Sequence, residues 1–298
     1  MSVSAKHILS QWPVLRGLGE VALKAATNLT PKGPAQIPGE WMEAELPCRP
    51  PELVRDYIRH VGGDPAWYKG RLPGHFFPQW SFHLASKALL VLPYPLTRVM
   101  NAGCRIEQNA PLPADEPLVV RVRLSSVDDD GSRVKCVTQI ETGTKSEPMA
   151  LRCEMRTYIP LGKPSGEKKV SKPKSLIPSA AREIGFFRLG ADAGLDFAKL
   201  TGDFNPIHWI APAARAAGFR SCILHGFSTL GRAIEALNRS RFAGDPTRLQ
   251  WIDVRFVRPL VLPAAVGVYV GEGGALWVGD APSGGSYLEG QFLAENEQ

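Results

Sequence analysis

The stretch of sequence most informative for the fold is Phe197-Ala-Lys-Leu-Thr-Gly-Asp203-Phe-Asn205-Pro206-Ile-His208. Asp203 and His208 stand five residues apart, and Asn205-Pro206 disfavours a helix between them, so the chain bends there. A bend can bring the carboxyl and imidazole groups to one point, which a continuous helix would not do at this spacing. A carboxylate beside an imidazole can hold and deprotonate a water molecule. The same residues are also compatible with a helix cap, a turn and a surface histidine.

The sequence after this stretch strengthens the chemical interpretation. It continues with Ala214-Arg-Ala-Ala-Gly218-Phe219 and then Ile223-Leu-His225-Gly226. Together with Gly-Asp-x-Asn-Pro-x-His, these runs resemble the signature of the MaoC-like (R)-specific enoyl-CoA hydratases and 3-hydroxyacyl-thioester dehydratases. One position departs from the family pattern, because many members have Asp two residues after the motif histidine and this chain has Ile210.

The resemblance implies a fold, a reaction and a set of roles. The fold is α+β, a double hot-dog in which each half is a long helix wrapped by an antiparallel sheet. The reaction is reversible hydration of trans-2-enoyl thioesters to (R)-3-hydroxyacyl thioesters. Asp203 and His208 would hold the water, Asn205 would orient the site, and the backbone N–H of Gly226 would donate to the thioester oxygen. Glycine at a helix start suits this last role, because it permits close approach to free N–H groups.

Further residues are expected to bind the substrate: Phe76, Phe77, Trp80, His225 and Phe227. The aromatic residues of the first half, with Phe82, suit the wall of an acyl-chain tunnel, although such a density of rings is also ordinary core packing. His225 is expected to act by packing beside the site. Neither a metal nor a redox cofactor is expected, since no Cys or His pair has the spacing of zinc ligands. Coenzyme A or phosphopantetheine would enter as part of the substrate.

The two halves of the chain resemble diverged copies. At an offset of 150 residues, the run Arg105–Pro113 matches Arg255–Pro263 at its ends, and His75 falls on His225. Matches that share one order and nearly one spacing indicate an internal duplication. The first copy keeps Gly63-Asp64-Pro65, but Trp67-Tyr68-Lys69 stands where the motif Asn and His would fall. We therefore expect one active site per chain.

The predicted domain organisation follows from this duplication. Residues 1–45 are an N-terminal extension, 46–160 a degenerate hot-dog half, 161–178 a basic linker rich in Pro and Gly, and 179–298 the catalytic half. Periodicity predicts long helices at 79–91 and 227–237. It predicts strands at 118–124, 133–142, 149–159, 249–257, 265–270, 275–278 and 286–293, with turns at Asp128–Gly131 and at two Gly-Gly pairs.

Composition limits the partners. The net charge is +6, and five lysines crowd the linker against one glutamate, which is typical of a solvated tether or of attraction to an acidic carrier protein or to coenzyme phosphates. No aromatic or motif support for nucleic-acid binding accompanies this charge, and no apolar run is long enough to span a membrane. The five cysteines are expected to be reduced thiols in a cytoplasmic protein, for which a homodimer is one of the oligomeric states left open. A transit peptide in residues 1–30, and so the mitochondrial matrix, is the less favoured alternative.

Two other functions stay open on the sequence alone. A non-catalytic module that binds acyl thioesters or their carrier protein would use the same fold, but it would not need the Asp203 and His208 pair. A hot-dog thioesterase would place a carboxylate on the long helix to activate hydrolysis. Glu235 is the acid available there, and it lies about two and a half turns beyond Gly226.

Overall fold

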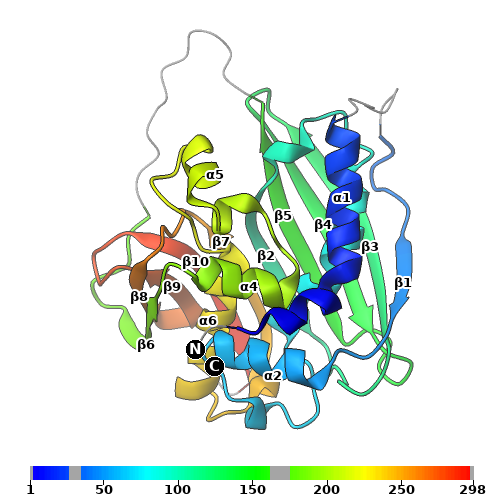
Figure 1. Cartoon of the computed structure of the whole chain (residues 1–298). Coiled ribbons are helices and arrows are strands. Elements are labelled where there is room, and N and C mark those ends of the chain that lie inside the picture. The colour runs from blue at the N-terminus through cyan, green and yellow to red at the C-terminus, as the bar shows by residue number, and fades with distance from the viewer. Residues whose placement is uncertain (1–2, 27–34, 162–174, 296–298) are drawn as a thin grey trace.

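A single ten-stranded sheet is the framework of the protein. The computed structural model describes residues 3–26, 35–161 and 175–295. The strand order is β1-β3-β4-β5-β2-β7-β10-β9-β8-β6, so each half contributes five strands (Figure 1). The strands are β1 Met42–Leu46, β2 Met100–Gln108, β3 Leu118–Asp129, β4 Arg133–Gly143, β5 Leu151–Pro160, β6 Arg182–Leu189, β7 Leu249–Phe256, β8 Ala264–Val270, β9 Ala275–Gly279 and β10 Ser286–Ala294.

The halves join where β2 pairs antiparallel with β7. Cys104 lies opposite Val254 and Arg105 opposite Asp253. Arg156 of β5 reaches across this junction and donates two hydrogen bonds of 2.7 Å to the carboxylate of Asp253. The expected arrangement of two hot-dog halves side by side, with their sheets forming one extended surface, is confirmed.

The described residues also form six α-helices, of which two are central. α3 and α6 lie against the sheets of their own halves, and nearly every residue of both is buried. The helices are α1 Trp12–Ala26, α2 Pro51–His60, α3 Pro78–Leu89, α4 Ala193–Thr201, α5 Ala211–Ala216 and α6 Gly226–Ser240. α1 packs on α3, where a Cβ at Gly17 would meet that of His83 at 2.9 Å. Glycine at this position therefore allows the two helices to approach closely.

All the predicted strands are present, and two of them show the alternation of buried and exposed residues by which they were predicted. β3 and β5 alternate between buried and part-exposed residues along most of their length. The turn after β3 uses Gly131 at φ +77°, as the Asp-Gly signal predicts. β1, β2 and β6 were not predicted. In β2 the cause is a bulge at Gly103, which has φ +147° and lies so close to Val254 that a Cβ would meet its carbonyl oxygen.

The predicted domain boundaries meet the structure at two places. β1 begins at Met42, inside the predicted extension, because Met42 to Leu46 pair with Val122 to Leu118 of β3. Most of the predicted linker falls on residues 162–174, which lie outside the described residues. All five cysteines are free thiols, as expected. Within the described ranges, no helix has the length and apolarity to cross a membrane.

Candidate active site

The loop after α4 carries the predicted catalytic motif. α4 ends at Gly202, whose φ of +82° is the left-handed conformation that terminates many helices. The side chain of Asn205 then caps a short 3₁₀ turn at Pro206–His208 by accepting a hydrogen bond from the N–H of Ile207 at 3.4 Å. The bend predicted at Asn-Pro is therefore present, and it turns His208 back toward Asp203.

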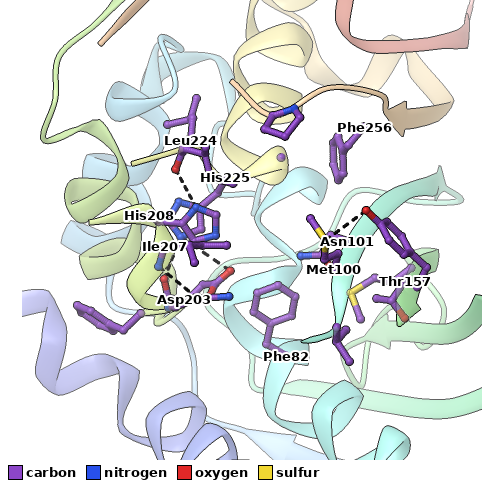
Figure 2. A pocket seen from close by; sticks show the side chains of 18 of the residues that line it. Phe82, Met100, Asn101, Thr157, Asp203, Ile207, His208, Leu224, His225 and Phe256 are labelled. Carbon is purple, nitrogen blue, oxygen red and sulfur yellow. Dashed lines mark hydrogen bonds and ion pairs between the residues drawn. The ribbon is translucent and has the colours of Figure 1, made fainter. Parts of the chain in front are cut away.

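Asp203, His208 and His225 converge at one point of the structure (Figure 2). One ring nitrogen of each histidine and a carboxylate oxygen of Asp203 all lie within 4.8 Å of one another. The rings of His208 and His225 stack with centroids 3.6 Å apart and planes 24° apart. The carboxylate of Asp203 also accepts a hydrogen bond of 3.3 Å from the N–H of Asn205.

Hydrogen bonds to backbone carbonyls fix the tautomer of each histidine. His208 donates from Nδ1 to the carbonyl of Ile223 at 2.8 Å, so the neutral ring keeps its lone pair on Nε2. His225 donates from Nε2 to the carbonyl of Asp203 at 2.9 Å. That bond ties the start of α6 to the motif loop, which makes His225 a residue that positions Asp203. The prediction that His225 acts by packing agrees with this geometry.

Burial sets the protonation of the three groups. It raises the pKa of Asp203, against the opposing effect of His208. Burial also lowers the pKa of His208 and, further, that of His225. At neutral pH both imidazoles are therefore neutral, and His208 is available as a base. Three groups of this kind are also possible cation ligands, and the prediction that no metal binds here stays a prediction.

The start of α6 provides a hydrogen-bond donor beside this group. The N–H of Gly226 belongs to the first turn of the helix, so it has no partner within the helix. Ser228 and Thr229 donate to the carbonyl of His225, and among the described residues no bond uses the N–H of Gly226. A Cβ at Gly226 would meet the ring of Phe256 at 2.7 Å. Only glycine therefore fits between the donor and the aromatic wall.

A cavity of about 660 Å³ joins these groups. Figure 2 shows Asp203, His208 and His225 on one side of it, Met100, Asn101 and Phe256 on the other, and Phe82 between them. The apolar part of the wall comes from both halves: Leu15, Phe82, Ala85, Leu89, Leu96, Val99 and Met155 from α1 and the N-terminal half, and Ile207, Ile223, Leu224, Phe256, Val257 and Leu260 from the C-terminal half. A cavity of this size and lining suits a largely apolar ligand.

The N-terminal segment supports the catalytic loop. Gln11 donates from Nε2 to the carbonyls of Lys199 and Leu200, which are at the end of α4. Val14 packs so closely on Gly202 that a Cβ there would lie 2.8 Å from it. The predicted extension thus satisfies the last carbonyls of α4 and holds the residue that precedes Asp203.

Comparison with known proteins agrees with this geometry. Residues 188–277, which include the motif loop and α6, match the family model described as "MaoC like domain". Residues 188–277 are thus a MaoC-like domain. The chain is 30% identical over 193 residues to 3-hydroxyacyl-thioester dehydratase X of Mycobacterium tuberculosis, which covers 62% of this chain and 64% of that protein. It is 30% identical over 165 residues to the peroxisomal enoyl-CoA hydratase 2 of Arabidopsis thaliana, which covers 51% and 53%.

The comparison of folds covers more of the chain than the comparison of sequences does. A crystal structure of HtdX from Mycobacterium tuberculosis superposes with a TM-score of 0.69 at 19% identity, over 86% of this chain and all of that one. The aligned segments of the two sequence relatives, in contrast, span less than two thirds of either protein. The structural match therefore supports the double hot-dog across both halves, whereas the family model matches residues 188–277 of the second half.

Four of the predicted substrate-binding residues do not lie on the cavity wall: Phe76, Phe77, Trp80 and Phe227. They are fully buried core residues. Phe77 packs edge-to-face on Phe227 at 5.4 Å, and Trp80 donates to the hydroxyl of Thr142 at 3.1 Å. The alternative of ordinary core packing describes them, whereas Phe82 does face the cavity.

The first half holds a different group of polar residues where its copy of the site would be. Glu235 of α6 is buried and accepts a hydrogen bond of 2.7 Å from the hydroxyl of Tyr68. His75 lies 3.2 Å from the same carboxylate, and Asn238 donates to its other oxygen at 3.0 Å. A Cβ at Gly63 would run into this carboxylate. These mutually bonded side chains occupy the position that a second Asp and His pair would take, in agreement with one catalytic group per chain.

Phe256 is a functional residue that the sequence analysis missed. It closes over Gly226 and lines the cavity. A signal was present, because Phe256 follows Arg255 in the run that matches the first half. The contribution of α1 to the cavity had no comparable signal, since it depends on how a helix far away in the sequence packs.

Proposed function

We propose that this protein is a hydro-lyase that reversibly hydrates trans-2-enoyl thioesters to (R)-3-hydroxyacyl thioesters. The observation that carries the proposal is the convergence of Asp203 and His208 on one cavity, with the free N–H of Gly226 beside them. The printed names of the two sequence relatives, a dehydratase and a hydratase, agree with it. The R configuration rests on the family resemblance.

The substrate would lie with its thioester oxygen on the N–H of Gly226. A water between Asp203 and Nε2 of His208 would attack C3 while the pair removes its proton. Negative charge then moves to the thioester oxygen as an enolate, where the helix N–H and the helix dipole stabilise it. Protonation of C2 by the same pair completes the addition of water. The enoyl chain would extend along Phe82 and Met155 into the apolar part of the cavity.

The two other functions predict different arrangements. A thioesterase needs a carboxylate of the long helix in the cavity, but Glu235 is bonded to Tyr68 and Asn238 and is not among the cavity-lining residues. A binding module needs no base. The tautomer of His208, with its lone pair on Nε2, favours chemistry over binding alone.

One assay separates the three functions. The purified protein is mixed with crotonyl-CoA, and enoyl absorbance is followed together with free thiol. A hydratase lowers the enoyl absorbance and releases no thiol, a thioesterase releases thiol, and a binding module changes neither. Loss of absorbance that persists in the Asp203→Asn, His208→Ala double variant would contradict the proposed site.

A further inference from the structure

Arg258 is a cation on the wall of the cavity, just beyond the end of β7. Its guanidinium lies over the ring of Tyr287 at 3.9 Å. Nη2 donates to Asp280 at 2.7 Å and to the carbonyl of Gly285 at 3.1 Å. The side chain is 43% exposed, so one face of the guanidinium is open to solvent and to the cavity.

Three contacts hold this guanidinium in place. The hydroxyl of Tyr287 donates to the second oxygen of Asp280 at 2.7 Å, which ties the ring and the carboxylate together. A Cβ at Gly285 would lie 3.0 Å from the guanidinium carbon, so glycine there allows the close packing. Arginine loses less rotamer freedom on binding when it is already fixed in this way.

The open side of Arg258 retains donors. All of its hydrogen bonds within the described residues run through Nη2, so Nε and Nη1 have none. Arg220 is a second cation close enough to influence Tyr287, and Asp280 is the acid bonded to the arginine. The carboxylate of Asp280 engages only Nη2, so a planar guanidinium with donors left on its other side, and a second cation nearby, is a site for a phosphate group.

Arg258 lies in the same cavity as the N–H of Gly226, which is the proposed partner of the thioester oxygen. Phe256, two residues earlier, lies against Gly226, and Arg258 lines the same cavity as both of them. A pantetheine arm that leaves the thioester at Gly226 can therefore pass Val257 and present its terminal phosphate to the guanidinium.

We infer that Arg258 binds the phosphate at the end of the pantetheine arm and so selects phosphorylated thioester substrates. The inference rests on the proposed hydratase function. The same phosphate occurs in coenzyme A and in the arm of an acyl carrier protein. A contact to this phosphate does not let Arg258 distinguish coenzyme A from a carrier protein. It does discriminate against thioesters that lack the phosphate.

The test uses three crotonyl thioesters: that of coenzyme A, of 4′-phosphopantetheine and of pantetheine. The expected result is that Arg258→Ala lowers kcat/KM about 10- to 100-fold for the first two, mainly through KM, as for a lost charge-assisted hydrogen bond. Crotonyl-pantetheine should be hydrated equally by both proteins. Arg258→Lys should lose part of this discrimination, since it keeps a cation without the planar fork.

Arg255→Ala is the matched control. Arg255 lies near the end of β7, is 70% exposed and pairs with Glu289, but does not line the cavity. Its substitution should leave kcat/KM unchanged for all three substrates. An equal loss on phosphopantetheine and CoA supports a contact to the shared phosphate, as on a carrier arm, whereas a loss on CoA alone would place the contact on the remaining phosphates of CoA and overturn the inference.

A loss that is equal for crotonyl-pantetheine, or no loss at all, overturns the inference. If the unmodified protein hydrates none of the substrates, the proposed function fails. Calorimetric binding of free coenzyme A against pantetheine then tests Arg258 by itself. Unchanged binding of coenzyme A to Arg258→Ala would refute the contact independently of any activity.

Discussion

Gly226→Ala tests the assignment of the oxyanion donor, because alanine keeps the N–H and changes only the space around it. The new Cβ would lie 2.7 Å from the ring of Phe256, and ordinary contact begins near 3.4 Å. Either the ring or the start of α6 must therefore move by about 0.7 Å. A hydrogen bond of about 2.9 Å that lengthens by this amount passes the limit of about 3.5 Å and is lost.

Loss of one such donor lowers turnover by about 10²–10³, or roughly 2.7–4 kcal/mol. We expect this loss in kcat for crotonyl-CoA with little change in KM, since the bond strengthens mainly in the transition state. Adding Phe256→Leu to Gly226→Ala should recover part of the turnover by making room. Gly190→Ala is the control, because nothing lies within 4 Å of a Cβ there. Full turnover in Gly226→Ala would refute the reasoning, and so would a failure of Phe256→Leu to restore any of it.

Three other expectations concern the base and the cavity. Asp203→Asn and His208→Ala should each lower kcat by about 10²–10⁴, and the double variant should lose less than the product of the two, as both act on one water; Asp64→Asn, at the degenerate copy, should leave the rate unchanged, and a fully multiplicative double loss would contradict the shared water. The rate should fall on acidification, because proton uptake by Asp203 and His208 removes the base; burial raises the pKa of Asp203, so its carboxylate takes up a proton at a higher pH than free aspartate, and lowers the pKa of His208, so its imidazole stays neutral to a lower pH than free histidine. A rate that does not change on acidification, in protein that stays folded by circular dichroism, would oppose this. Gly19→Leu should favour crotonyl-CoA over a decenoyl thioester by about tenfold or more, because Gly19 lines the cavity and nothing lies within 4 Å of a Cβ there; an unchanged ratio of kcat/KM values would show that α1 does not limit the chain.

The catalytic group was predictable because it is local. Asp203, Asn205 and His208 lie within six residues, and Asn-Pro dictates the bend that brings them together. Gly226 was predictable because a helix start after His225 offers free donors whatever the tertiary packing. These residues depend on short-range geometry, which a motif records.

The cavity wall was less predictable because it depends on which face of a buried helix meets the ligand. α3 is buried on all sides, so its periodicity does not separate Phe82, which faces the cavity, from Phe77, which packs in the core. β2 was missed for a related reason, since its bulge at Gly103 breaks the alternation that marks a strand.

The two long helices carry different side chains at the position of Glu235. At the same offset of 150 residues its counterpart on α3 is Ala85, which lines the cavity. The same place on two related helices is thus occupied by an acid in one half and by a methyl group in the other. The acid, with Tyr68, plugs one hollow, while the methyl group leaves the other open to an acyl chain. Two similar halves in one chain can therefore serve different ends: the second half carries the proposed Asp203 and His208 pair, and the first contributes part of the cavity wall beside it.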